Sequence, residues 1–148
     1  MKISNQSTNT WEDPFVENML SVLIPAHNEE KEINGTVHNL IKTLEREKID
    51  HELLIVNDNS TDRTQAVLDQ LSHQLHTLRV VDNLDSRGFG QAVKCGLNAF
   101  RGQCVAIVMA DGSDDPKDLV RFFRKWSEGY DCVFGDRFTT NSEIIDYP

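Results

Sequence analysis

Short apolar runs alternate with helical patterns along most of the chain, and this alternation limits the fold more than any other feature of the sequence. The apolar runs are predicted strands, at residues 20–24, 53–56, 78–81, 105–109 and 132–134. Strict alternation of strands and helices predicts an α/β fold, with a parallel sheet that carries helices on both faces.

Apolar residues between these runs recur at helical spacing and predict four helices. The inward faces of the first two are formed by Ile33, Val37, Leu40, Ile41 and Leu44, and by Val67, Leu68, Leu71 and Leu75. The third places on one stripe Phe89, Ala92, Val93, Gly96, Leu97 and Phe100. The fourth begins at Pro116, is capped by Asp114 or Asp115, and directs inward Leu119, Phe123 and Trp126.

The length of 148 residues fits one domain. We expect a flexible tail at residues 1–18, a ligand-binding domain at 19–138, and an incomplete loop or acceptor region at 139–148. The 24 acidic residues exceed the 15 basic ones and give a net charge of −9, and no Lys/Arg cluster appears along the chain. A nucleic-acid partner is therefore not expected, because duplexes favour a basic patch.

The three cysteines, Cys95, Cys104 and Cys132, are far apart in the sequence and lie in apolar segments. We predict buried free thiols in a reducing compartment. No apolar run approaches the roughly 18 residues of a transmembrane helix, and the polar N-terminus lacks the pattern of a signal peptide. These features predict a cytoplasmic protein.

Polar clusters follow three of the predicted strands, at residues 25–30, 57–62 and 110–116. The carboxyl ends of parallel strands meet at one edge of a sheet, and ligands of such sheets bind outside that edge. The sequence therefore predicts a binding site there.

Each cluster also has a purely structural interpretation. In the first, Asn28 could cap a helix whose first turn holds Glu29 and Glu30 as partners of the helix dipole. In the second, a helix cap explains one or two residues. It does not explain why Asp58 stands directly at the strand end, where its carboxylate can accept a hydrogen bond from a base or a ribose. A carboxylate at a strand end should support little of the core, so Asp58→Ala is expected to weaken nucleotide binding without unfolding the chain.

The third cluster holds three carboxylates, Asp111, Asp114 and Asp115, within five positions. Such carboxylates repel one another unless a cation or a helix N-terminus neutralises them. One can serve as a cap, and hard oxygen ligands on a loop suit Mg²⁺ or Mn²⁺ shared with a diphosphate. The Gly88–Gly90 pair follows the third strand and lacks the third glycine of a dinucleotide fingerprint, and no P-loop occurs.

Taken together, these segments resemble the nucleotide-binding half of family 2 glycosyltransferases with the GT-A fold, a Rossmann-like three-layer sandwich around a mostly parallel sheet. They are similar to polyprenyl-phosphate sugar transferases such as dolichol-phosphate mannosyltransferase. The resemblance covers residues 20–148, which implies a truncated domain, and rests on the segments 21–29, 56–64, 87–90, 108–116 and 134–138.

The resemblance implies roles for individual residues. The nucleotide-sugar pocket would be lined by Pro25, Ala26, His27, Glu29, Val56, Asp58, Arg87, Gly88, Asp111 and Arg137, with Glu29 near the ribose and Val56 and Asp58 at the base. The catalytic groups would be Asp111, Asp114 and Arg137. The metal ligands, for Mg²⁺ or Mn²⁺, would come from Asp111, Asp114 and Asp115.

The sequence departs from the family pattern in three places. His27 stands where the family usually has Tyr, and Asn57 stands where it often has Asp. Ala110 and Gly112 occupy the positions of the usual DxD carboxylates. A metal site must therefore be built from the neighbouring aspartates.

The resemblance implies transfer of a sugar, with inversion, from a GDP- or UDP-linked donor to a polyprenyl phosphate or another acceptor. The resemblance is also compatible with contact with the cytoplasmic face of the membrane and with a homo-oligomer. Two alternatives are a nucleotide-sugar-binding fragment without catalysis and a nucleotidyltransferase, although the latter needs a glycine-rich basic loop after the first strand. We expect the 148-residue chain alone to bind nucleotide and to transfer little sugar, unless a second copy or another chain completes the site.

Overall fold

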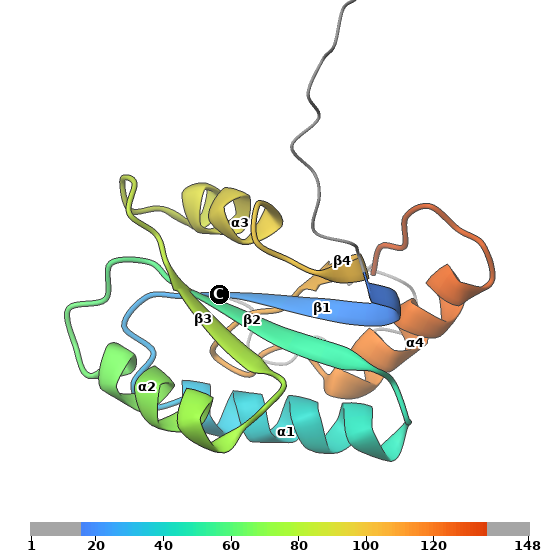
Figure 1. Cartoon of the computed structure of the whole chain (residues 1–148), viewed down its shortest axis with the longest axis horizontal. Helices are drawn as coiled ribbons and strands as arrows, with labels where there is room; N and C mark the ends of the chain where they lie inside the picture. The colour runs from blue at the N-terminus through green and yellow to red at the C-terminus, as the bar shows by residue number, and fades with distance from the viewer. Residues whose placement is uncertain (1–15, 136–148) are drawn as a thin grey trace, which may run out of the picture.

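The computed structural model describes residues 16–135, which form a four-stranded sheet covered by helices (Figure 1). All neighbouring strands pair in parallel, in the order β3-β2-β1-β4. The strands are β1 (Val16–Ala26), β2 (His51–Asn57), β3 (Leu78–Asp82) and β4 (Gly102–Ile107). The predicted parallel sheet is confirmed.

The helices cover both faces of this sheet and make three layers (Figure 1). One face carries α1 (Ile33–Arg46), α2 (Thr64–Gln74) and α4 (Pro116–Ser127), and the other carries α3 (Phe89–Leu97). Since α3 joins β3 to β4 on the far side of β1, a right-handed crossover places it on the opposite face.

No helix within residues 16–135 combines the length and the apolar character needed to cross a membrane.

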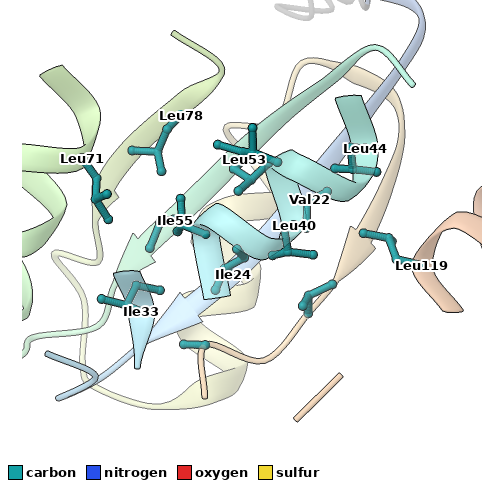
Figure 2. Close-up of a cluster of buried hydrophobic side chains, with 14 of the residues drawn as sticks. Val22, Ile24, Ile33, Leu40, Leu44, Leu53, Ile55, Leu71, Leu78 and Leu119 are labelled. Atoms are coloured by element: carbon teal, nitrogen blue, oxygen red, sulfur yellow. The ribbon is translucent and has the colours of Figure 1, made fainter. Parts of the chain in front are cut away.

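Two hydrophobic clusters form the core, one on each face of the sheet. Residues of β1 alternate between them: Val22 and Ile24 face α1, whereas Leu23 packs on the side of α3 with Ala92. Figure 2 shows the larger cluster, in which Leu40 and Leu44 of α1 lie over the side chains of β1 and β2. The two central strands, β1 and β2, are buried on both faces, which explains their continuous apolar runs.

The structure corrects several boundaries. No strand forms at residues 132–134, and Phe134 is 85% exposed, because a run of three residues is too short to fix a strand without a partner. The predicted tail at residues 1–18 includes positions that belong to β1, which begins at Val16. The ranges 1–15 and 136–148, including the expected region 139–148, lie outside the described residues.

Pro25 does not end the first strand as predicted, since β1 continues to Ala26. Main-chain bonds to β2 involve Leu20 and Ala26, whereas Leu23 bonds Val108 after β4. Main-chain groups of successive residues point to opposite neighbours, so those of Pro25, like those of Leu23, point toward β4. The pairing of β1 with β4 extends only to Leu23. A proline, which has no N–H, costs no ladder bond at that point.

Side-chain exposure corrects two further expectations. Phe89 and Leu97 of α3 are 55% and 41% exposed, so the buried stripe of this short helix is narrower than predicted and centres on Ala92 and Gly96. Cys132 is exposed, whereas Cys95 and Cys104 are half-buried, and no disulfide joins them. Burial raises the pKa of Cys104 to about 11, which makes this thiol unreactive at neutral pH.

A buried polar network joins three strands near their amino ends. The Glu52 carboxylate accepts hydrogen bonds from the Ser21 hydroxyl (2.6 Å), from Arg79 (2.6 Å) and from the Arg101 amide (2.7 Å). Burial acts to raise the pKa of Glu52, but the bonds from Ser21, Arg79 and Arg101 outweigh it, and the pKa lies below its usual value of 4.5. This buried charge is therefore fully compensated.

We predict that Glu52→Gln destabilises the chain by about 1–3 kcal/mol at pH 7, the cost of losing charge-assisted hydrogen bonds. Because the folded pKa is lower than the unfolded one, ionised Glu52 stabilises the fold above pH 4.5, and this contribution disappears as the pH falls through the folded pKa. Urea unfolding of both proteins across this range should show the difference shrinking with falling pH. A difference that does not change with pH would contradict this role.

Gly102 lies where β4 approaches the neighbouring strand β1. A Cβ at this position would stand 2.5 Å from the Met19 carbonyl oxygen and 2.7 Å from the Ser21 nitrogen. Both are main-chain atoms in the sheet, so they cannot move aside. Only glycine fits here.

We predict that Gly102→Ala destabilises the fold by about 1–3 kcal/mol or more, the range for overpacking. Gly35→Ala is the matched control, since a Cβ at Gly35 in α1 meets nothing within 4 Å. Alanine there should stabilise the chain by about 0.5–1 kcal/mol. Thermal unfolding of both variants checks the pair, and equal effects would refute the steric argument.

Candidate functional site

The carboxyl ends of the strands carry the loops in which the sequence places its polar clusters. The strand order reverses between β1 and β4, since β2 and β3 lie on one side of β1 and β4 on the other. A crevice at such a reversal is where open α/β sheets bind ligands. The loops at this edge are residues 27–32, 58–63, 83–88 and 108–115.

Asp58 connects three of these loops. Its carboxylate accepts hydrogen bonds from the Asn83 side chain (2.7 Å) and from the Gly88 amide (2.9 Å). Its main-chain N–H bonds to the Ala26 carbonyl (2.8 Å). The residue is 4% exposed, so its charge is buried and hydrogen-bonded. Asp58 is therefore structural as well, contrary to the expectation that it supports little of the fold.

His27 lies half-buried over the main chain of Asp58. Its Nδ1 is 2.7 Å from the Asp58 carbonyl oxygen, which can only accept, so Nδ1 carries the ring hydrogen. Nε2 of the neutral ring then accepts from Arg87 Nη1 at 3.4 Å and from the Asn28 amide at 3.2 Å. The ring thus links the loop after β1 to the loop that precedes α3.

Asn28 holds the loops after β1 and β2 together. Its side-chain oxygen accepts from the Thr61 amide (2.7 Å), and its own N–H bonds to the Ser60 hydroxyl (3.1 Å). The Glu29 N–H bonds to Thr64 Oγ1 at 2.8 Å. Asn28 has a φ of 57°, a left-handed conformation that asparagine tolerates better than most residues.

The predicted helix cap at Asn28 is thus wrong. α1 begins only at Ile33, and its first turn holds no acidic residue, so Glu29 and Glu30 lie in the preceding loop. The polar side chains there serve contacts between loops rather than the helix end.

The loop after β4 contains the three predicted metal ligands. Asp115 caps α4 through the Lys117 amide (2.9 Å), which confirms the predicted cap. Asp114 accepts from the Met109 amide (2.8 Å), and Asp111 from the Ser113 amide (3.0 Å). Within residues 16–135 no three His, Cys, Asp or Glu side chains gather so as to hold a metal ion, and the predicted trio is therefore not assembled as one site.

Negative charge nevertheless accumulates around Glu29. Its pKa is raised by burial first and then by the carboxylates of Asp111, Glu32 and Asp62, with a smaller opposing effect from His27. The loops after β1 and β4 thus face one another with like charge. Thr36 of α1 supports the loop after β4, since its hydroxyl donates to the Ala110 carbonyl at 2.8 Å.

The other predicted residues are distributed as follows. Pro25, Ala26 and Val56 are buried at the ends of β1 and β2, so their side chains support the site from the core. Gly88 has a φ of 151°, which side-chain-bearing residues rarely adopt, and this lets its N–H meet Asp58. Arg137 lies outside the described residues.

Sequence analysis missed Asn83. This side chain is 3% exposed and donates both to Asp58 and to the Ser86 carbonyl, at 3.3 Å. Its position directly after β3 was a usable indication, because Asp58, which the sequence did single out, stands directly after β2 in the same way.

The sheet and its edge define an α/β domain whose candidate binding site lies at the strand ends. Residues 21–148 match the model of the family described as glycosyl transferase family 2, and the chain therefore belongs to that family. The GT-A fold expected from the sequence is confirmed by the solved structures that it resembles.

Two relatives illustrate the similarity. The uncharacterized glycosyltransferase YkcC of Bacillus subtilis (strain 168) is 32% identical over 127 residues, 84% of this chain and 39% of that protein. The undecaprenyl-phosphate 4-deoxy-4-formamido-L-arabinose transferase of Proteus mirabilis (strain HI4320) is 30% identical over 120 residues, 78% of this chain and 36% of that protein. The chain thus spans less than half the length of these relatives.

Two solved structures, each 27% identical to the chain, contain a bound nucleotide sugar. S. aureus TarS in complex with UDP-GlcNAc superposes with a TM-score of 0.57, over 72% of this chain and 31% of that one. The mannosyltransferase PcManGT from Pyrobaculum calidifontis, in complex with GDP-Man and Mn²⁺, has a TM-score of 0.56, over 67% of this chain and 29% of that one.

We predict that Asp58→Asn destabilises the chain by about 1–3 kcal/mol, because an amide cannot accept from both Asn83 and Gly88. The exchange Asp58→Asn with Asn83→Asp reverses the donor and acceptor of that pair and should recover part of the loss. Urea unfolding of both variants measures this. No recovery in the exchanged variant would show that the pair does not act as described.

Proposed function

We propose that this chain forms the donor-binding part of a glycosyltransferase that transfers a sugar from a GDP- or UDP-linked donor to a polyprenyl phosphate. The observation that carries the proposal is the convergence of His27, Asp58, Arg87 and Asp111 from four strand ends on one edge of the sheet. Similar structures hold UDP-GlcNAc or GDP-Man, and one relative acts on undecaprenyl phosphate.

The nucleoside would bind between the loops after β1 and β3. His27 and Arg87 present a flat ring and a guanidinium that meet at 3.4 Å, and both chemistries suit a base or its ribose. Asp58 holds these groups through its carbonyl and through Gly88, so we assign it a positioning role. Glu29 would accept from the ribose hydroxyls.

The diphosphate would lie toward the loop after β4. A divalent cation, Mg²⁺ or Mn²⁺, would neutralise it there, with Asp111 as the protein carboxylate and the remaining ligands from phosphate and water. The mutual repulsion of Glu29 and Asp111 fits this assignment, because a cation would relieve it. Asp114 and Asp115 would support the loop through their main-chain bonds.

In the transfer step, an oxygen of the acceptor phosphate attacks the anomeric carbon and forms the new C–O bond. The bond from that carbon to the donor diphosphate breaks, and the nucleoside diphosphate leaves with the electron pair, so that the configuration inverts. The acceptor oxygen is already anionic and needs no general base. Arg137 would meet the charge of the leaving group.

A nucleotide-sugar-binding role without transfer is the second candidate. It is favoured by the absence of an assembled metal cluster in the described part of the chain and by Ala110 and Gly112 at the usual carboxylate positions. Little transfer is expected of the 148-residue chain alone, so the decisive outcome is a positive one: transfer of labelled sugar from a nucleotide sugar into a polyprenyl phosphate would exclude the binding-only role.

We predict that GDP or UDP binds at least about tenfold more tightly with Mn²⁺ than with EDTA, because Glu29 and Asp111 would otherwise repel the phosphates. Titration calorimetry measures both affinities. Asp111→Asn should abolish most of this dependence on metal. Asp69→Asn, which changes an exposed carboxylate on α2, should leave it intact.

The outcomes separate the two parts of the proposal. Equal affinity with Mn²⁺ and with EDTA would remove the cation from the site and leave the donor class standing. Failure of both nucleotides to bind under either condition would refute the donor class itself.

A further inference from the structure

The ring of His27 lies between neighbours of opposite hydrogen-bonding character. Its Nδ1 is 2.7 Å from the main-chain carbonyl oxygen of Asp58, which can only accept. Its Nε2 is 3.2 Å from the side-chain nitrogen of Asn28 and 3.4 Å from Nη1 of Arg87, which can only donate. The neutral ring therefore fits these neighbours in one tautomer, with its hydrogen on Nδ1.

The side-chain amide of Asn28 cannot reverse this polarity by rotating. Its oxygen already accepts from the Thr61 N–H (2.7 Å), from the Thr61 hydroxyl (3.3 Å) and from the Asp62 N–H (3.4 Å). A rotated amide would direct its NH₂ group at two main-chain N–H groups and lose these bonds. The NH₂ group therefore stays directed at Nε2 of His27, and contacts in the loop after β2 fix the tautomer of a ring in the loop after β1.

A proton added to Nε2 would disrupt this arrangement. The imidazolium carries a hydrogen on both nitrogens, so Nε2 of His27 could accept neither from Asn28 nor from Arg87. The guanidinium of Arg87 is always charged and would in addition face a second positive charge. Arg87 is exposed, so its side chain can turn outward into solvent, whereas the Asn28 side chain is held by the loop after β2.

Other charged groups near the ring come from the loops that meet at this edge of the sheet. Glu29 lies within electrostatic reach of His27, and Asp111 acts on Glu29 from the loop after β4. Asp58 adds a carboxylate that is already hydrogen-bonded. These carboxylates favour a charged ring, whereas Arg87 disfavours it. Histidine is the side chain whose charge ordinarily changes between pH 5 and 8.

We infer that Asn28 is a positioning residue that holds His27 in the neutral Nδ1–H form, and that protonation of His27 releases Arg87 from the candidate donor site. The junction of the three loops is thus a pH-sensitive latch on Arg87, closed when the ring is neutral and open when it is charged. The tautomer and the release depend only on these contacts. The effect on a ligand rests on the proposed function, in which His27 and Arg87 meet the nucleoside.

Long-range proton–nitrogen correlation spectra of the full chain, recorded without ligand, test the latch itself. His27 should show the Nδ1–H form at pH 8 and the imidazolium at pH 5.5, and the side-chain Nε–H signal of Arg87 should shift together with it. Asn28→Asp keeps an oxygen for Thr61 but places a carboxylate oxygen at Nε2, so it should raise the imidazolium fraction at pH 7. The matched control Asn39→Asp adds the same charge at an exposed position of α1 and should leave His27 unchanged.

Chemical-shift titration with uridine and with guanosine tests the consequence for the ligand. Neither nucleoside carries a phosphate or changes its charge between pH 5.5 and 8, so a change in affinity reports on the protein. The wild-type chain should bind about tenfold more weakly at pH 5.5 than at pH 8, the loss of a hydrogen bond from a charged donor. His27→Gln carries a donor and an acceptor, as the neutral ring does, but takes up no proton, and its affinity should be the same at both pH values.

An Nε2–H tautomer at pH 8, or an Arg87 signal that does not respond when the ring gains its proton, would overturn the latch. A loss of affinity in acid that is as large in His27→Gln as in the wild type would assign the loss to another group and overturn it as well. If neither nucleoside binds at pH 8, the proposed donor site fails, and the spectra of the ligand-free chain still decide the latch. If Asn28→Asp does not fold, the wild-type spectra and His27→Gln decide it in the same way.

Discussion

The central strand β1 is the constraint on which the rest of the structure depends. It pairs with β2 on one side and with β4 on the other, and its two faces supply both hydrophobic clusters. A strand in this position has no free choice of register, because a shift by one residue would exchange Val22 with Leu23 between the two clusters. The loops that follow β1, β2 and β4 are therefore held at one edge.

Acidic and basic side chains gather in different regions of the fold. Carboxylates collect at the strand ends, where Glu29 experiences Asp111, Glu32 and Asp62, while cations collect between α1 and α4. The acidic loops at the strand ends and the cations between α1 and α4 are therefore two separate regions of one chain.

Asp58 illustrates how stability and recognition share residues at this edge. A buried charge persists only when it is hydrogen-bonded, and Asn83 and Gly88 supply those bonds. The carboxylate thereby fixes the turn that presents Arg87. The main-chain carbonyl of Asp58 orients His27, which in turn contacts Arg87. Recognition at this site would act through groups that Asp58 positions.

The sequence by itself determined the order of elements, the parallel sheet and the edge that carries the site, because hydrophobic periodicity and strand-end positions are local properties. It also determined the family and narrowed the cap of α4 to Asp114 or Asp115, between which the structure chose Asp115. Only the tertiary structure decided that Asn28 joins two loops instead of capping a helix, that Asn83 compensates Asp58, and that residues 132–134 form no strand. The same holds for the ion pair of Glu47 with Arg124, residues that are far apart in the chain and meet only because α1 and α4 pack side by side. Contacts between distant segments depend on packing, and no local pattern records them.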